Sequence, residues 1–190
     1  MKTLVVLLVV LLATGSAAAA EVTLSAGPLI PLLGDSLWDE GDSDAAVSGR
    51  VHFHRTSTGP VSFGPFLSVR RTTWQTGWIG MDSRHLQRGG ATSDASVWEM
   101  GLLLRLRDSS AVVSPVGELS AGAAVVDLDE YDESVTPVLV AVSGGFSWRV
   151  SARLEAYVQS GATLYMGDAR GVVMPASAGV AWTFGGGLGS

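Results

Sequence analysis

The side chains with the greatest capacity for chemistry are carboxylates, guanidinium groups and imidazoles that alternate with apolar residues along several segments. A carboxylate near an arginine is the usual equipment of general acid–base catalysis, but the same pair can serve only to neutralise two buried charges. The sequence favours the second interpretation, because single charges of both signs interrupt a face of small polar residues. The expected polar network comprises Arg50, His52, Arg70, Glu99, Arg105, Glu118, Arg149 and Glu155.

Two imidazoles raise the question of a metal site. His52 and His54 share one strand face with Arg50, but no carboxylate stands at ligand spacing within that segment. We therefore expect hydrogen-bonded imidazoles that fill space. Because the sequence also lacks a glycine-rich phosphate loop, a nucleophile elbow and a zinc-protease motif, we expect no catalytic, cofactor-binding or metal-binding residues and no cofactor.

The elements that must position these side chains are strands. After residue 20 there is no convincing helical period, whereas eight stretches alternate with a period of two residues. They are 21–32, 45–55, 61–72, 96–107, 112–125, 136–150, 153–166 and a last one containing 177–184. The pattern predicts an all-β protein, an eight-stranded antiparallel up-and-down barrel.

The connections between these stretches alternate in length. Long ones follow the first, third, fifth and seventh stretches, and tight ones follow the second, fourth and sixth. In an up-and-down meander all long loops then lie at one end and all tight turns at the other, as in outer-membrane barrels.

The composition of the two faces separates a membrane barrel from a soluble barrel. The polar face consists of Gly, Ser, Ala and Thr with isolated charges, which suits a narrow lumen, and the apolar face carries Leu, Val, Met, Trp and Phe, which suits lipid. We expect a closed polar lumen in which Arg70 and Glu99, at similar heights on neighbouring strands, form an ion pair. Five aromatic residues are expected outside near the tight-turn end, as a belt at the membrane interface: Phe53, Phe63, Trp148, Trp182 and Phe184.

The N-terminal segment predicts export. Lys2 precedes the apolar run 4–13 and small residues follow, which is the pattern of a secretory signal peptide with cleavage near Ala20/Glu21. We expect a signal peptide at 1–20, the barrel at 21–184 and a flexible tail at 185–190. The chain of 190 residues has no cysteine and a net charge of −6, so thiolate metal sites are excluded and nucleic-acid binding is disfavoured.

Two of the expected long loops are acidic and one is basic and aromatic. Calcium binding by the acidic loops is an open alternative. Simple solvation of the loops is favoured, because neither loop has the EF-hand pattern. The basic–aromatic loop could contact lipopolysaccharide phosphates or a partner. The acidic residues are Asp35, Asp39, Glu40, Asp42, Asp44, Asp127, Asp129, Glu130, Asp132 and Glu133, and the basic–aromatic ones are Arg71, Trp74, Trp78, Arg84, His85 and Arg88.

The segment SAGVAWTF, residues 177–184, carries the most specific motif. Its order of Ser177, Gly179, Trp182 and Phe184 resembles the C-terminal signal of small eight-stranded outer-membrane barrels of the OmpA-transmembrane-domain and OmpX-like group. The resemblance implies a bacterial outer-membrane location, recognition by the barrel-assembly machinery and periplasmic chaperones, contact with the bilayer and lipopolysaccharide, and a monomer. The family usually ends on the last aromatic residue, whereas this chain continues for six residues.

Three functions remain compatible with such a barrel. The first is a non-enzymatic barrel whose loops serve envelope integrity or surface interaction. The second is an OmpW-like transporter of small hydrophobic molecules, which would need an apolar lumen or a lateral opening. The third is a lipid A-modifying barrel enzyme, which the inward phase of His52 and His54 and the lack of an HxSN motif disfavour.

Overall fold

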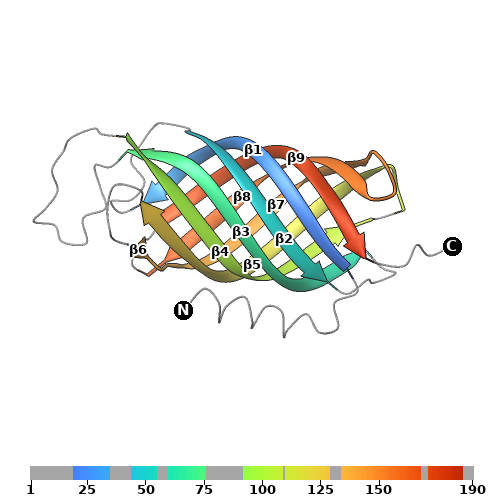
Figure 1. Ribbon diagram of the computed structural model, residues 1–190, viewed down its shortest axis with the longest axis horizontal. Coiled ribbons are helices and arrows are strands. Elements are labelled where there is room, and N and C mark those ends of the chain that lie inside the picture. Colours follow the sequence, from blue (N-terminus) through green and yellow to red (C-terminus); the bar gives the residue numbers. More distant parts are fainter. Residues whose placement is uncertain are drawn as a thin grey trace, which may run out of the picture.

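The fold is a closed antiparallel β-barrel in the computed structural model, which describes residues 19–34, 44–54, 60–75, 92–108, 110–128, 134–167 and 171–185. The strands are β1 (Ala19–Gly34), β2 (Asp44–His54), β3 (Val61–Gln75), β4 (Thr92–Arg107), β5 (Val113–Leu128), β6 (Ser134–Val135), β7 (Val138–Arg149), β8 (Leu154–Met166) and β9 (Gly171–Gly185). Their order around the sheet is β4-β3-β2-β1-β9-β8-β7-β5-β6, and an additional β4–β5 pairing closes the ring (Figure 1). No described segment is a helix long and apolar enough to span a membrane.

The predicted up-and-down barrel of eight strands is confirmed, with one local difference. The expected sixth strand, 136–150, corresponds to β7, and the two-residue β6 precedes it outside the expected bounds. Pro137 lies between them and has no N–H to donate to the ladder. Its carbonyl still accepts a hydrogen bond of 2.8 Å from Ala124 N, so the strand direction continues across the interruption.

The start of β1, the ends of β2, β4 and β7 and the end of β9 lie at one end of the barrel, which we call the turn end. The opposite end is called the loop end. Several strands run further toward the loop end than the alternation predicts: β3 reaches Gln75 and β4 begins at Thr92. These extensions are polar, so they lack the apolar alternation, but backbone hydrogen bonds still hold them in the ladder.

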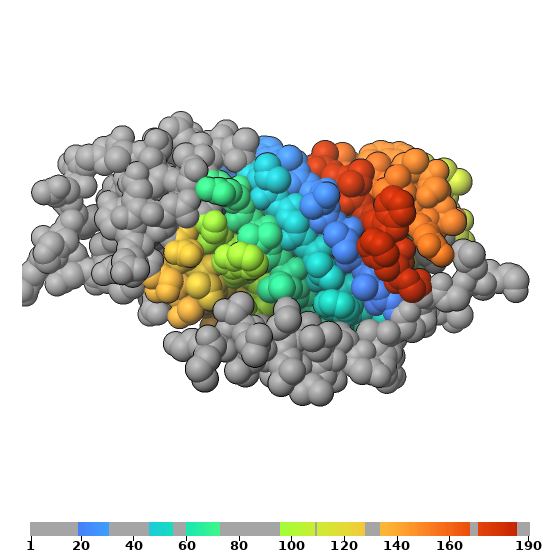
Figure 2. All heavy atoms as spheres, in the orientation of Figure 1, coloured from blue at the N-terminus to red at the C-terminus, as the bar shows by residue number. Residues whose placement is uncertain are grey.

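The outer wall of the barrel is apolar. Large hydrophobic side chains remain exposed on every one of the eight long strands, including Leu24 at 59%, Val142 at 58% and Phe63 at 55%. A soluble monomer would bury such side chains, whereas a membrane barrel turns them to lipid. Figure 2 shows this wall where β1, in blue, meets β9, in red.

Glycine allows the lumen wall to close tightly. Gly101 on β4 faces Gly122 on β5, and a Cβ added at either would lie 2.1 or 2.0 Å from a backbone oxygen of the neighbouring strand. Only residues without a side chain permit that approach.

At the turn end, Asp108 Oδ1 accepts hydrogen bonds from the hydroxyl and amide of Ser110, which hold the pKa of the Asp108 carboxyl below its usual value.

Candidate functional site in the barrel lumen

The lumen is filled in three layers along the barrel axis. A cluster of ion pairs occupies the turn end, a small polar cavity lies in the middle, and apolar side chains close the loop end. The strand alternation produces these layers, because inward positions of all eight long strands meet on the axis. Each layer is described in turn.

Glu118 on β5 is the centre of the turn-end cluster. Its two carboxylate oxygens accept bonds from Arg50 Nη1 and Nη2 at 2.8 and 2.9 Å, a bidentate arrangement. Arg105 on β4 donates to the same carboxylate from Nε, at 2.6 Å. The Glu118 and Arg105 side chains are only 5% and 7% exposed, so both charges are removed from bulk water.

Two members of this cluster were not among the residues predicted from the sequence. Glu21 on β1 is 1% exposed and accepts from Arg105, and it also lies 3.5 Å from Arg107 Nη1. Arg107 in turn donates to Glu155 on β8 at 2.6 Å. Parity could have identified both, because Glu21 is in phase with Thr23 and Arg107 is in phase with Arg105.

A second group of polar side chains lies nearer the loop end. The ion pair predicted between Arg70 and Glu99 is present, with 3.8 Å between Arg70 Nη2 and Glu99 Oε1. Glu99 also accepts from Ser68 Oγ at 2.9 Å and from Tyr165 Oη at 2.7 Å. Tyr165, which is 2% exposed, was missed although parity could have found it, because it is in phase with Tyr157 and Thr163 on the inward face of β8.

The remaining predicted residues take different positions. His52 is fully buried and fills the lumen wall, but neither ring nitrogen has a hydrogen-bond partner among the residues described, so the expected hydrogen bonding is wrong. Its ring centroid lies 5.1 Å from that of His54. Arg149 stands opposite Glu155 in the β7–β8 ladder, yet the Glu155 carboxylate accepts from Arg107 instead.

The ion pairs found among the described lumen residues join four guanidinium groups to four carboxylates. Arg50, Arg105 and Arg107 meet Glu21, Glu118 and Glu155 at the turn end, and Arg70 meets Glu99 above them. A carboxylate already engaged by one or two guanidinium groups is a poor general base, because its charged form is stabilised. The geometry is that of a neutral plug in which each buried charge is compensated.

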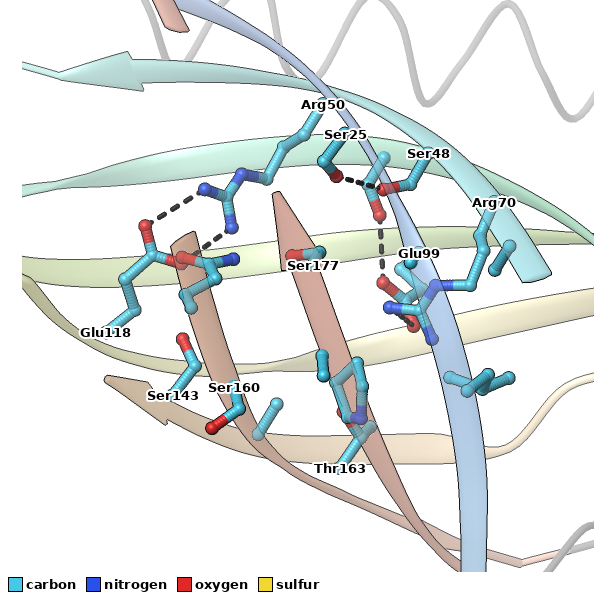
Figure 3. Close-up of a pocket in the computed structure, with 18 of the residues that line it drawn as sticks. Ser25, Ser48, Arg50, Arg70, Glu99, Glu118, Ser143, Ser160, Thr163 and Ser177 are labelled. Carbon is cyan, nitrogen blue, oxygen red and sulfur yellow. Dashed lines mark hydrogen bonds and ion pairs between the residues drawn. The ribbon is translucent and has the colours of Figure 1, made fainter. Parts of the chain in front are cut away.

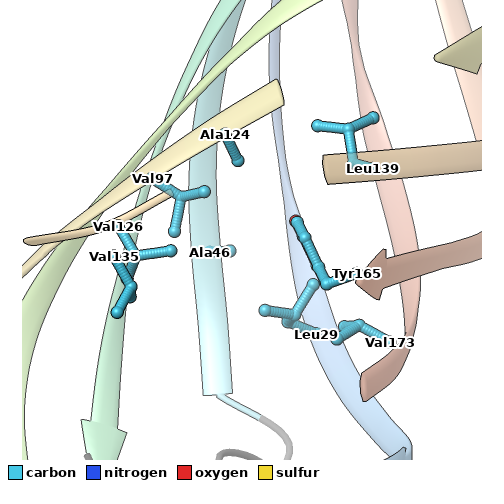
Figure 4. Packing of buried hydrophobic residues seen from close by; sticks show 9 residues of the cluster. All are labelled: Leu29, Ala46, Val97, Ala124, Val126, Val135, Leu139, Tyr165 and Val173. Atoms are coloured by element: carbon cyan, nitrogen blue, oxygen red, sulfur yellow. The ribbon is translucent and has the colours of Figure 1, made fainter. Parts of the chain in front are cut away.

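The loop-end layer corrects the prediction of a polar lumen. Leu139, Val97 and Val173 are 1%, 2% and 0% exposed and pack inside the barrel with Leu29, Ala46, Ala124, Val126, Val135 and Tyr165 (Figure 4). Phe66 and Leu103 are also buried inward residues. Phe66 is in phase with Arg70 and Leu103 with Arg105, so alternation already placed both inward, but only the polar members of this face entered the expected lumen.

The middle layer is a cavity of ≈ 100 Å³ between the charged cluster and the apolar cluster. Hydroxyl groups dominate its wall, and Ser25 Oγ lies 2.7 Å from Ser48 Oγ. Figure 3 shows Arg50 directed toward Glu118 and Arg70 beside Glu99, on two sides of this space. A volume of this size holds several water molecules, since one needs roughly 10–15 Å³ by the same measure.

The C-terminal motif lies on β9. Ser177 and Gly179 are half-buried in the lumen phase, while Trp182 and Phe184 are 45% and 49% exposed on the outer wall, with ring centroids 6.0 Å apart. The predicted closure of the last strand against the first is confirmed by the register from Ala19–Gly185 to Gly34–Gly171. Of the other predicted outer aromatics, Phe63 and Trp148 are exposed and Phe53 is half-buried.

Several predictions concern residues outside those described. The tail beyond Gly185 and most of the acidic and basic–aromatic loop residues belong to that part of the chain. Asp127 is exposed near the end of β5, and Arg71 is exposed on β3. Within the described ranges no three metal-ligating side chains come together.

The fold is that of the small eight-stranded outer-membrane β-barrels. Comparison with solved structures gives Neisserial surface protein A at 18% identity and a TM-score of 0.53, covering 87% of this chain and 96% of that chain. The N-terminal β-barrel domain of Pseudomonas aeruginosa OprF matches at 10% identity and 0.51, covering 88% and 98%. Yersinia pestis Ail, in complex with the heparin analogue sucrose octasulfate, matches at 10% and 0.50, covering 87% and 98%. No protein-family model and no curated sequence matches the chain.

Proposed function

We propose that this chain is a bacterial outer-membrane β-barrel without enzymatic activity, whose loops maintain the envelope or contact surface partners. The observation that carries the proposal is the pairing of an exposed apolar wall with a lumen occupied by side chains. A wall of this kind requires lipid, and a filled lumen leaves the loops as the part of the molecule available to partners. Two similar barrels are described as a surface protein and as an attachment invasion locus protein, which accords with a role at the cell surface.

Export and assembly belong to the same proposal. Residues 1–20 would direct secretion and be removed, and β1 would then begin at Glu21, whose side chain still reaches Arg105. Periplasmic chaperones would deliver the chain, and the assembly machinery would recognise Ser177, Gly179, Trp182 and Phe184 on β9. The folded monomer would contact the bilayer through its outer wall and lipopolysaccharide through the basic–aromatic loop.

The OmpW-like alternative receives one supporting observation, the apolar layer at the loop end. That layer is packed, however, because Leu139, Val97 and Val173 are almost fully buried. A transporter would need these side chains to separate. A lipid A-modifying activity is less well supported, since His52 lies buried within the lumen wall rather than on the lipid-facing surface.

The test is a loop replacement in intact cells. Residues 76–91 between β3 and β4 are exchanged for a Gly/Ser segment of equal length, and heat-modifiable gel migration with membrane fractionation checks that wild type and variant are folded in the outer membrane. In cells lacking the protein, wild type should restore resistance to a detergent and the loop variant should not. Full restoration of detergent resistance by the variant would show that this loop is not needed for the proposed function. Wild-type protein in the soluble fraction would contradict the proposed outer-membrane location.

A further inference from the structure

The seam at which the barrel closes, between β1 and β9, is not continuously bonded. Residues are paired from Ala19–Gly185 to Ala26–Ala178, and the register then passes directly to Leu29–Pro175. Pro28 lies in this gap and has no N–H to donate. A proline within a paired strand removes a ladder hydrogen bond, so it is normally confined to edges and bulges.

The other ladder of β9 is interrupted close by. Pairing with β8 includes Ser160–Ala176 and resumes at Thr163–Val173. Pro175 occupies this second gap and also lacks an N–H. Residues 174–177 of β9 are therefore paired to β8 or to β1, but not to both, so each of these four residues is held by a backbone ladder on one side only. The β1–β9 register keeps its phase across the gap at Pro28 and shifts between Pro31 and Leu33.

A shallow groove runs over the outside of the same wall. One row of small residues crosses four strands in register, Gly117 to Gly144, Gly144 to Ser160 and Ser160 to Ala176. Pro28, Pro115, Phe146 and Val158 complete the apolar lining. Small residues between larger ones leave a shallow, open depression, and Ser160 is among the residues that line it.

The groove and the central cavity meet at this segment. Both are lined by Pro28, Gln159, Ser160, Ala176 and Ser177, so only the backbone of the gapped seam separates them. On the inner side Ser25, Ser48 and Ser177 present hydroxyls to the cavity (Figure 3). The apolar groove on the lipid-facing side thus lies next to the hydroxyl-lined cavity of the lumen.

The charges of the cavity select the kind of group that would enter it. Arg50 is matched by Glu118 and Arg70 by Glu99, so an additional ionic group would remain uncompensated. Arg50 Nε is buried without a hydrogen-bond partner among the residues described, which leaves one donor for a neutral oxygen. A small uncharged hydroxyl group fits these constraints.

We propose that the β1–β9 seam is a lateral binding site for a single-chain amphiphile with an uncharged hydroxyl head, such as a monoacylglycerol. The acyl chain lies in the groove beside Phe146 and Val158, and the head passes between Pro28 and Ala176 to the serine hydroxyls of the cavity. The bilayer around the barrel supplies such molecules directly. The site does not involve the loops, so a negative result here would leave the proposed loop function unaffected.

The experiment uses the full chain folded in phospholipid vesicles and a monoacylglycerol with a photoreactive diazirine on its acyl chain. Mass spectrometry of the labelled peptides should show several-fold enrichment on β8 and β9 over β3 and β4, on the opposite wall. Equal labelling of all strands would mean an ordinary lipid shell and would overturn the proposal. Equal seam labelling by a fatty acid of the same chain length would overturn the assignment of an uncharged head.

A seam variant and a matched control decide whether the gap matters. Pro28→Val restores an N–H and should abolish the enrichment, because the gap can then close. Pro65→Val makes the same change on β3, where the β3–β4 ladder runs unbroken through Pro65–Leu102, and should leave the enrichment intact. Heat-modifiable migration confirms folding; if Pro28→Val does not fold, Ser160→Phe fills the groove without touching the seam. Undiminished labelling of a folded seam or groove variant contradicts the proposal.

Discussion

The carboxylate of Glu118 shows how individual residues close the lumen. It accepts from Arg50 and Arg105 together, and Arg105 also pairs with Glu21, so four strands, β1, β2, β4 and β5, are joined through side chains. Buried ion pairs are weak evidence of net stabilisation, but loss of one partner leaves an uncompensated charge. The cluster is therefore sensitive to substitution.

Replacing Glu118 with Gln should destabilise the barrel strongly. Arg50 and Arg105 would both lose their shared carboxylate, and breaking a buried pair in this way costs about 3–5 kcal/mol. Urea unfolding of the protein in vesicles, followed by tryptophan fluorescence, measures the loss. Asp127→Asn, an exposed carboxylate on the same strand, is the control and should change stability by less than about 0.5 kcal/mol. Similar losses for the two variants would contradict the prediction that the Glu118 carboxylate compensates buried guanidinium charges.

At the scale of elements, β9 has two tasks on its two faces. Its inward residues Ser177 and Gly179 help to line the lumen wall, while Trp182 and Phe184 stack outside near the turn end. The strand also closes the ring against β1. If its last residues are the assembly signal, an aromatic on β9 should matter for biogenesis more than an equivalent aromatic elsewhere.

Phe184→Ala should reduce the amount of folded protein in the outer membrane several-fold. Phe63→Ala on β3 removes an aromatic of similar exposure, 55% against 49%, and serves as the control. Fractionation and heat-modifiable migration give the yield in cells, and urea unfolding of refolded protein gives stability. The signal is specific if the yields differ while the stabilities fall alike. Equal yields would show that Phe184 contributes only lipid contact.

At the scale of the whole molecule, the lumen carries two barriers in series. The ion-pair cluster closes the turn end and the apolar cluster closes the loop end, with the small cavity between them. Passage of a solute would require both layers to open together. The outer wall meanwhile reverses the arrangement of a soluble protein, with its large apolar side chains outward.

Liposomes containing the purified protein should retain entrapped arabinose as well as protein-free liposomes do. Removing one layer, by Arg105→Ala or Leu139→Ala, should leave retention intact, because the other layer still blocks the lumen. The double variant should release the sugar. Rapid release by the wild-type protein would contradict the closed lumen and favour the transporter alternative.

Much of this architecture follows from the sequence alone. Alternation identified the eight strands and the faces of Arg50, Glu99, Arg105 and Glu118, since a residue's parity within a strand decides its side. Counting from the two tight turns that flank β3 and β4 also predicted the ion pair of Arg70 and Glu99, because it places them at similar heights on adjacent strands.

The tertiary structure determines contacts across the barrel that the parity of a residue within its strand cannot predict. Arg105 reaches Glu21 and Arg107 reaches Glu155 across the barrel, and such contacts depend on closure and stagger rather than on neighbouring strands. Leu139 and Val97 point inward as apolar side chains, and parity gives the side of each residue but not the kind of layer that inward side chains build together, so the apolar plug was missed. The gap at Pro28 and Pro175 likewise arises only when β1 and β9 meet, because a missing N–H matters only opposite the strand that would have accepted it.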